Sequence, residues 1–216
     1  MPDPENLEQL KSCVEPAFEE FYRIYADSIS EREQKSREWI CEMVRRSDYK
    51  VLVMKRNNQV IALSMIFLPD SEAFGLLEYM AVKDDFRNQG LGGELFRRSM
   101  KSALTAKGRS VPVLLEVDSD REECIDRKLR ARRQQFYRRL GCLRLAGLHY
   151  ILPLPGKGSL PQMDLMIYPA DNLQSIPKSE LERWLEVIYQ GVYNCSPGDP
   201  RIKQILRDVS DSVRLE

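Results

Sequence analysis

A glycine-rich turn at residues 87–93 is the segment best suited to chemistry. It reads Arg87-Asn88-Gln89-Gly90-Leu91-Gly92-Gly93 and lies between a strand-like run that ends at Val82 and a helical run that begins at Gly90. A turn that opens a helix directs backbone N–H groups and the positive end of the helix dipole at one spot. Glycines at 90 and 92 let a phosphate approach the main chain, and Arg87 could add a charge-assisted hydrogen bond. The turn predicts a phosphate or pyrophosphate site, with a ligand-free turn as the alternative.

Other kinds of phosphate loop fit this sequence less well. A Walker A loop needs Gly-Lys-Ser/Thr at a helix start, and the similar stretch at residues 156–159 lacks the upstream glycine. A dinucleotide fingerprint needs a third glycine where Leu95 stands, and residues 83–89 separate the first glycine from the strand. Glu116 and Asp118 lie near the sequence distance of a ribose-binding acid, so dinucleotide binding remains a weaker alternative.

Hydrophobic periodicity predicts the elements that hold this turn. Helical spacing indicates helices over 3–25 with a break or kink at Pro16, over 30–46, over 90–106, and up to residue 140. Two more are expected at the C-terminus, one capped by Ser179 and Glu182 and one starting at Asp199-Pro200. Strands are expected over 49–55, 60–68, 76–82, 111–117, 142–152 and 163–168, with an Asn57-Asn58 hairpin turn and a long connection over 153–161. The pattern predicts one α/β domain with a helical C-terminal extension.

Composition narrows the class of partner. The chain has 216 residues, with 33 Lys plus Arg and 33 Asp plus Glu, so its formal net charge is zero. A neutral chain has no overall field that would attract nucleic acid or anionic lipid. No apolar stretch approaches the roughly 20 residues that span a bilayer, and the first ten residues are acidic and polar, unlike a signal peptide. We therefore expect no nucleic acid, no membrane and a cytoplasmic location.

Cysteine and histidine usage argues against metal and disulfide chemistry. The five cysteines are odd in number and widely spaced, so they are expected to be reduced, with no disulfide framework and no zinc site. His149 is the one histidine, which excludes a multi-histidine metal site and leaves one candidate for a histidine-based triad. We expect no bound metal.

Two blocks of the sequence resemble the GNAT superfamily of acyl-CoA-dependent N-acetyltransferases. Residues 77–92 are similar to that family's fourth strand and pyrophosphate loop, whose pattern is Arg/Gln-x-x-Gly-x-Gly/Ala. Residues 115–117 look like its fifth strand, and residues 135–142, Gln-Phe-Tyr-Arg-Arg-Leu-Gly-Cys, resemble its Phe-Tyr-x-x-Leu-Gly-Phe helix end. Two blocks in the right order are more specific than either alone.

The resemblance implies a fold and a set of cofactor contacts. It implies a mixed, mostly antiparallel central sheet flanked by helices, with the fourth and fifth strands splayed apart to admit the pantetheine arm of acetyl-CoA. We expect the GNAT-like domain to cover residues 1–170 and the helical extension, packed on it, to cover 171–216. The expected contacts to acetyl-CoA come from Met80, Ala81, Val82, Arg87, Asn88, Gln89, Gly90, Leu91, Gly92 and Gly93.

Three residues are the candidates for acid–base catalysis. The family commonly places at Tyr137 the general acid that protonates the departing thiolate. An ammonium acceptor must lose a proton before it attacks, so a carboxylate base is expected. Glu78 and Glu116 each lie in an otherwise apolar strand and match positions where family members place a base. Glu78 is preferred, Glu116 is second, and ion pairing to an arginine is the structural alternative for both.

The segment between Glu116 and Tyr137 departs from the family pattern. It is longer than the family's short form, with acidic residues first and basic residues afterwards, and it lacks the usual Asn and Ala before the Phe-Tyr pair. The spacing favours a solvated helix with Glu123–Arg127 and Asp126–Arg130 pairs.

The sequence as a whole predicts an N-acetyltransferase. It would move the acetyl group of acetyl-CoA to a small-molecule or peptide amine by direct attack, because no cysteine lies beside the histidine in a relay motif. The alternative is a non-catalytic acyl-CoA-binding or regulatory module. The apolar faces of the two closing helices would permit a homodimer.

Overall fold

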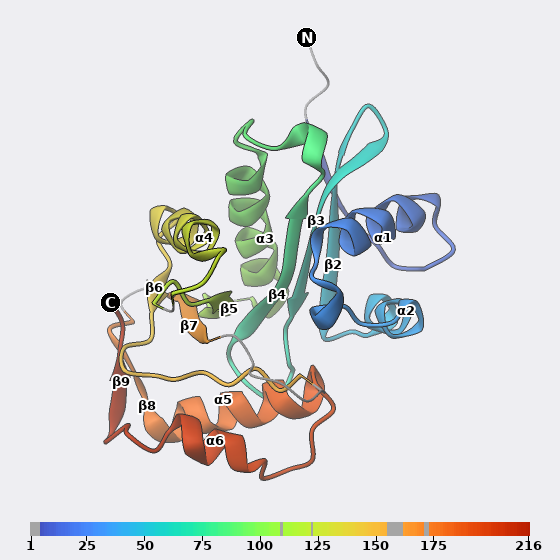
Figure 1. Ribbon diagram of the computed structural model, residues 1–216. Coiled ribbons are helices and arrows are strands. Elements are labelled where there is room, and N and C mark those ends of the chain that lie inside the picture. Colours follow the sequence, from blue (N-terminus) through green and yellow to red (C-terminus); the bar gives the residue numbers. More distant parts are fainter. Residues whose placement is uncertain (1–4, 109, 122, 155–161, 171–172) are drawn as a thin grey trace. The chain divides into compact units, whose positions relative to one another are not determined.

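A computed structural model describes residues 5–216 except 109, 122, 155–161 and 171–172 (Figure 1). By its internal contacts the chain divides into two compact units. The first is Met1–Asp70 with Leu77–Arg109, and the second is Ser71–Leu76 with Ser110–Glu216. The C-terminal helices therefore belong to the same unit as the strands that follow residue 110, while the expected domain boundary at residue 170 stays a prediction.

The first unit contains the strands β1 (Asn6–Gln9), β2 (Tyr49–Arg56), β3 (Gln59–Phe67) and most of β4 (Gly75–Val82), which lie in that order. β1 pairs antiparallel with β2, and β2 pairs antiparallel with β3. Asn57 and Asn58 connect β2 to β3 with φ angles of 50° and 61°. Asparagine tolerates this left-handed conformation, which tight hairpin turns require, so the expected hairpin is confirmed.

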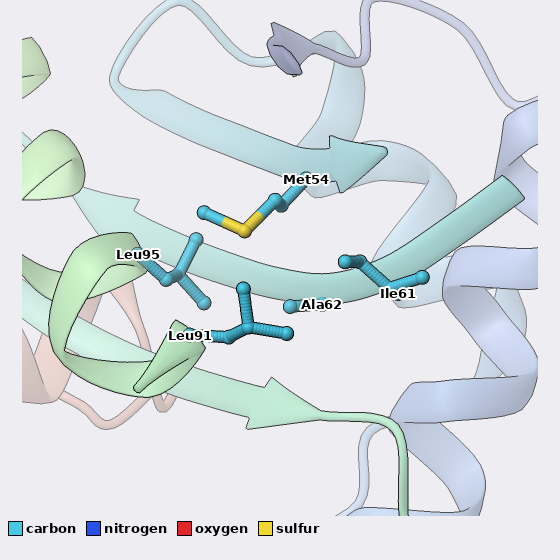
Figure 2. Packing of buried hydrophobic residues seen from close by; sticks show 5 residues of the cluster. All are labelled: Met54, Ile61, Ala62, Leu91 and Leu95. Atoms are coloured by element: carbon cyan, nitrogen blue, oxygen red, sulfur yellow. The ribbon is translucent and has the colours of Figure 1, made fainter. Parts of the chain in front are cut away.

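Helices cover both faces of this part of the sheet (Figure 1). α1 (Pro16–Ser28) packs on β3 and α2 (Arg37–Arg45) packs on β2, while α3 (Leu91–Lys107) lies on the opposite face. Figure 2 shows the contact that anchors the start of α3, where Leu91 and Leu95 pack among three residues of β2 and β3: Met54, Ile61 and Ala62. Burial of these leucines fixes the first turn of α3 against the sheet.

The N-terminal segment departs from the expected helix. Residues 6–9 form β1, and α1 begins only at Pro16, whose missing N–H costs nothing in the first turn of a helix. The helix expected over 30–46 is a short 3₁₀ turn, η1 (Glu31–Glu33), followed by α2. Residues 6–9 are extended because they pair with β2, and local periodicity does not report such a long-range contact.

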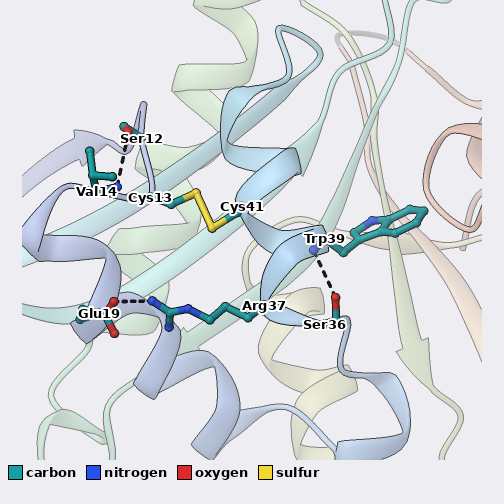
Figure 3. The surroundings of a disulfide bond; sticks show 8 residues. All are labelled: Ser12, Cys13, Val14, Glu19, Ser36, Arg37, Trp39 and Cys41. Carbon is teal, nitrogen blue, oxygen red and sulfur yellow. Dashed lines mark hydrogen bonds and ion pairs between the residues drawn. A yellow bond between two sulfur atoms is a disulfide. The ribbon is translucent and has the colours of Figure 1, made fainter.

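Cys13 and Cys41 form a disulfide, which corrects the expectation that all cysteines are reduced (Figure 3). The bond ties the segment before α1 to α2, with the two Cα atoms 5.5 Å apart. The free thiols are Cys124, Cys142 and Cys195. An odd number of cysteines still allows one disulfide. The spacing did not reveal it, because the two partners are 28 positions apart in sequence.

The second unit has its own antiparallel strands, β5 (Val113–Asp118), β7 (Met163–Tyr168) and β6 (Leu143–Arg144), in the order β5-β7-β6. α4 (Arg127–Arg139) packs on β5. Arg127 pairs with Glu123, and Arg130 pairs with Asp126, as expected for a charged helix. The strand expected over 142–152 shrinks to the two residues of β6, and the expected connection over 153–161 lies largely outside the described residues.

The C-terminal segment forms β8 (Ser175–Pro177), α5 (Lys178–Gly191), α6 (Pro200–Ile205) and β9 (Ser212–Arg214). α5 buries Trp184, whose ring stacks on Phe74 at 5.2 Å between centroids. Asp199 caps α6 by accepting a hydrogen bond from the Arg201 N–H, as expected. Ser179 lies inside α5, and its predicted capping role is wrong because Pro177 is the N-cap.

These elements confirm the expected fold class: mixed α/β, with mostly antiparallel strands flanked by helices and a helical segment at the C-terminus. Splaying of the fourth and fifth strands stays a prediction. Within the described ranges, no helix combines the length and apolarity needed to cross a membrane.

The disulfide generates a direct prediction. A thiol reagent should titrate three cysteines in denatured, non-reduced protein and all five after reduction. Cys41→Ser should lower the free energy of unfolding by about 2–4 kcal/mol, because the bond closes a long loop in the unfolded chain. Cys124→Ser is the matched control and should leave stability near wild type. Five titratable thiols before reduction would contradict the bond.

Candidate functional site

The glycine-rich turn in the first unit has the backbone that an anion site needs. Asn88 and Gly90 have φ angles of 62° and 82°, both left-handed, and Gly90 is the N-cap of α3. The Gly90 carbonyl accepts hydrogen bonds from the N–H groups of Gly93 (3.1 Å) and Glu94 (3.2 Å). The amides at the very start of a helix have no acceptor within the helix, so they are suited to an external anion.

Side chains of the turn hold it in shape. The Arg87 guanidinium donates to the Val82 carbonyl at 3.0 Å and pairs with Asp84 at 2.7 Å. The Gln89 side chain donates to the Asp85 carbonyl (3.3 Å) and accepts from Arg56 (3.2 Å). These contacts fix the path of the chain into α3, and a direct contact of Arg87 with a phosphate stays a prediction.

The end of β4 leads directly into this turn. The side chains of Met80 and Val82 pack against the cluster that anchors α3, and Ala81 is buried. The side chains therefore belong to the core, which leaves recognition of a pantetheine arm to the main chain, as the resemblance implies. That contact stays a prediction.

Glu78 lies in β4 and is held from two sides. Its side chain is 2% exposed, forms an ion pair with Lys35, and accepts a hydrogen bond from the Tyr49 hydroxyl at 2.9 Å. Burial, together with the neighbouring Glu78 charge, raises the pKa of Tyr49 well above its ordinary value, so this phenol stays protonated and donates. Glu78 is thus a buried carboxylate whose charge is matched by an ammonium.

Two tyrosines position the segment that carries Lys35. The Tyr79 hydroxyl donates to the Glu33 carbonyl at 2.8 Å, and the Tyr25 hydroxyl accepts from the Lys35 N–H at 2.7 Å. The Lys35 ammonium also lies 5.5 Å from the centre of the Tyr79 ring. These two hydrogen bonds and the cation–π contact hold the segment in place, and they therefore fix the pairing of Lys35 with Glu78.

Glu116 lies in β5 of the second unit and has different partners. It is partly exposed, and its two carboxylate oxygens accept hydrogen bonds from the hydroxyls of Tyr150 and Tyr193. Burial, with the Glu116 charge nearby, raises the pKa of Tyr150 well above its usual value. These two hydroxyl donors orient the carboxylate.

Tyr137 is placed by the packing of α4. One turn earlier, the buried Gln134 side chain donates to the Asp118 carbonyl and to Asp164 Oδ2, both at 3.0 Å. Burial raises the pKa of Tyr137 to about 12, so its phenol is protonated at neutral pH, as a general acid must be.

Sequence reasoning missed the partners of these carboxylates. Lys35, Tyr49, Tyr150 and Tyr193 are far in sequence from the glutamates that they contact, and no local pattern marks them. Asp164 could have been found, because it too is a carboxylate in an apolar strand, and it is 2% exposed with Arg121 as its ion-pair partner.

Residues 47–141 match the family model of the acetyltransferase (GNAT) domain. This segment is similar to GNAT acetyltransferase domains. It includes Glu78, Glu116, Tyr137 and the glycine-rich turn, whereas Lys35, Tyr150 and Tyr193 lie outside it.

Solved structures share the GNAT fold. A GNAT-family protein from Bacteroides thetaiotaomicron superposes with a TM-score of 0.68 at 20% identity, over 88% of this chain and 99% of that one. The ribosomal-protein-S18-alanine N-acetyltransferase of Escherichia coli gives 0.57 at 17%, over 79% and 99%. A GNAT family acetyltransferase from Elizabethkingia anophelis with acetyl-CoA bound gives 0.52 at 15%, over 76% and 97%. No curated protein matches the sequence.

The two glycines that cap the ends of α3 allow a matched test of the turn. Gly90 and Gly108 both have positive φ, and a Cβ added at either would meet no atom within 4 Å. Replacing either with alanine should therefore cost similar stability, about 1–2 kcal/mol. Only Gly90→Ala should weaken acetyl-CoA binding, roughly tenfold by calorimetry, because it alters the backbone that meets the pyrophosphate. Equal affinities of the two variants would exclude the turn as the binding site.

Proposed function

We propose that this protein transfers the acetyl group of acetyl-CoA to a primary amine by direct attack of the amine on the thioester. The observation that carries the proposal is that a GNAT acetyltransferase domain retains both a helix-opening glycine turn and ionisable groups with suited partners. The glycine-rich turn belongs to the first unit, and the proposed acid and base, Tyr137 and Glu116, belong to the second.

The base in this proposal is Glu116. The sequence alone favours Glu78, but the side chain of Glu78 is 2% exposed and is engaged by the Lys35 ammonium. An acceptor amine would have to displace Lys35 to reach it. Both glutamates are partly exposed as whole residues, and what distinguishes Glu116 is that the hydroxyls of Tyr150 and Tyr193 donate to it without carrying a positive charge. We therefore assign proton removal to Glu116 and a structural pair to Glu78.

The proposed chemistry balances with these groups. Glu116 takes a proton from the acceptor ammonium, the amine nitrogen bonds to the thioester carbon, and the carbon–sulfur bond then breaks. The departing thiolate takes the proton of the Tyr137 hydroxyl. The nitrogen gives up its second proton, which restores the Tyr137 phenol by way of water, and Glu116 releases its proton to solvent. The products are an N-acetylated amine and free CoA.

The thiols support direct attack over relay through cysteine. Burial raises the pKa of Cys142 to about 12, and it also raises the pKa of Cys195. A hydrogen bond to Asp126 raises the pKa of Cys124. A raised pKa disfavours the thiolate, which is the nucleophilic form, and Cys13 and Cys41 are bonded to each other.

Release of free CoA in the presence of amines tests the function. A panel of alkylamines, amino acids, aminoglycosides and peptides should contain at least one acceptor that gives thiol release together with an N-acetylated product by mass spectrometry. Acetyl-CoA binding without acetylation of any amine would instead favour a non-catalytic acyl-CoA-binding module.

Tyr137→Phe tests the acid. The substitution should lower kcat by about 100-fold, because the leaving thiolate loses its proton donor, while the affinity for acetyl-CoA stays at the wild-type value. Because the pKa of Tyr137 is about 12, the phenol is protonated below that pH and becomes unavailable only above it. The ratio of wild-type to variant rates should therefore be constant between about pH 6 and pH 10. A ratio that falls steeply across this range would contradict the assignment.

A further inference from the structure

Tyr193 reaches Glu116 from the C-terminal segment, 77 residues away in sequence. It follows the end of α5, outside the residues that match the GNAT family model. The carboxylate on which the proposed chemistry depends is therefore held by a part of the chain that the family domain does not include.

The turn after α5 is built to place this phenol. Asn194 adopts a left-handed φ of 56°, and the Cys195 N–H donates to the Tyr189 carbonyl at 2.9 Å, which closes the chain back on α5. The rings of Tyr189 and Tyr193 meet edge to face, 6.4 Å apart and inclined at 72°. Arg201, at the start of α6, donates to the Cys195 sulfur at 3.4 Å and lies 5.5 Å from the Tyr189 ring centre.

Tyr150 approaches Glu116 from another segment and is only 4% exposed. Tyr150 forms an isolated β-bridge with Met163, the first residue of β7, and β7 also pairs with β5, which carries Glu116. Glu116 thus lies between a buried phenol next to the sheet and a half-buried phenol from the C-terminal segment. Each oxygen of the carboxylate accepts a hydrogen bond from one of these two phenols, which fixes the rotation of the carboxylate.

We propose that Tyr193 is a positioning residue for acetyl transfer: it orients the Glu116 carboxylate to receive the ammonium of a cationic acceptor, so the C-terminal segment forms part of the acceptor site. This inference rests on the function proposed above. It gives the segment around α5 and α6 a role beyond packing. It also selects acceptors that carry a positive charge before reaction over neutral nucleophiles such as alcohols.

Tyr193→Phe removes the hydroxyl and keeps the ring. It should lower kcat/KM for a cationic amine roughly tenfold, as expected for loss of one charge-assisted hydrogen bond, with acetyl-CoA affinity unchanged. Tyr22→Phe, on α1 in the first unit, is the control and should behave as wild type. In a Glu116→Gln background, Tyr193→Phe should cause no further loss, because its effect acts through Glu116. An equal loss in both backgrounds would overturn the inference.

The pH profile gives a second readout that a packing role would not move. Without one donor the carboxylate protonates more easily, so the acid limb of kcat/KM in Tyr193→Phe should move to higher pH by about one unit. Charged and titratable groups extend outward from Glu116: Tyr189 and Cys195 act on Tyr150, and Arg201 and Asp199 act on Tyr189. The pKa values of these tyrosines and of Cys195 are all raised, so none of them accounts for an acid limb.

The outcomes separate the two proposals. If wild-type protein acetylates amines but the acid limb of Tyr193→Phe coincides with that of wild type, the inference fails and the proposed function stands. If wild-type protein binds acetyl-CoA and acetylates no amine, the proposed function fails and the inference fails with it.

Discussion

A carboxylate in an apolar strand needs partners, and this constraint organises both units. An unpaired charge removed from water is strongly destabilising. The chain meets the constraint three times with different chemistry: Glu78 takes the Lys35 ammonium, Asp164 takes the Arg121 guanidinium, and Glu116 takes two phenols. We propose that the choice of partner separates the roles of these carboxylates. A cation neutralises a carboxylate, whereas a phenol holds it in place and leaves its charge available to a substrate.

The glycine-rich turn obeys a different constraint. Gly90 must adopt a left-handed conformation to start α3, and Leu91 and Leu95 must then bury their side chains on β2 and β3. The same geometry that anchors the helix leaves its first amides at the surface. The predicted anion site would thus follow from the way that the helix begins.

Local patterns in the sequence were sufficient where local interactions decide the structure. The Asn57-Asn58 hairpin and the Glu123–Arg127 and Asp126–Arg130 pairs at the start of α4 depend on residues a few positions apart, and both features were predicted. β1 was mistaken for helix because its conformation depends on pairing with β2, in the register of Leu7 with Met54, which is far away in sequence. The Cys13–Cys41 bond and the phenols around Glu116 are also contacts between distant segments. The sequence therefore indicated which carboxylates are candidates, but it did not indicate their partners, which are distant in sequence.

Comparing Glu116→Gln with Glu78→Gln is the most direct test of the distinction between the two glutamates. Glu116→Gln should lower kcat/KM for an amine by about 100-fold with little change in the unfolding midpoint. Glu78→Gln should mainly lower the free energy of unfolding, by about 3 kcal/mol, because it leaves the Lys35 ammonium buried without its counter-charge. Adding Lys35→Met to Glu78→Gln should restore much of that stability. A Glu116→Gln variant with wild-type turnover, beside a stable but inactive Glu78→Gln variant, would contradict the assignment and return the base to Glu78.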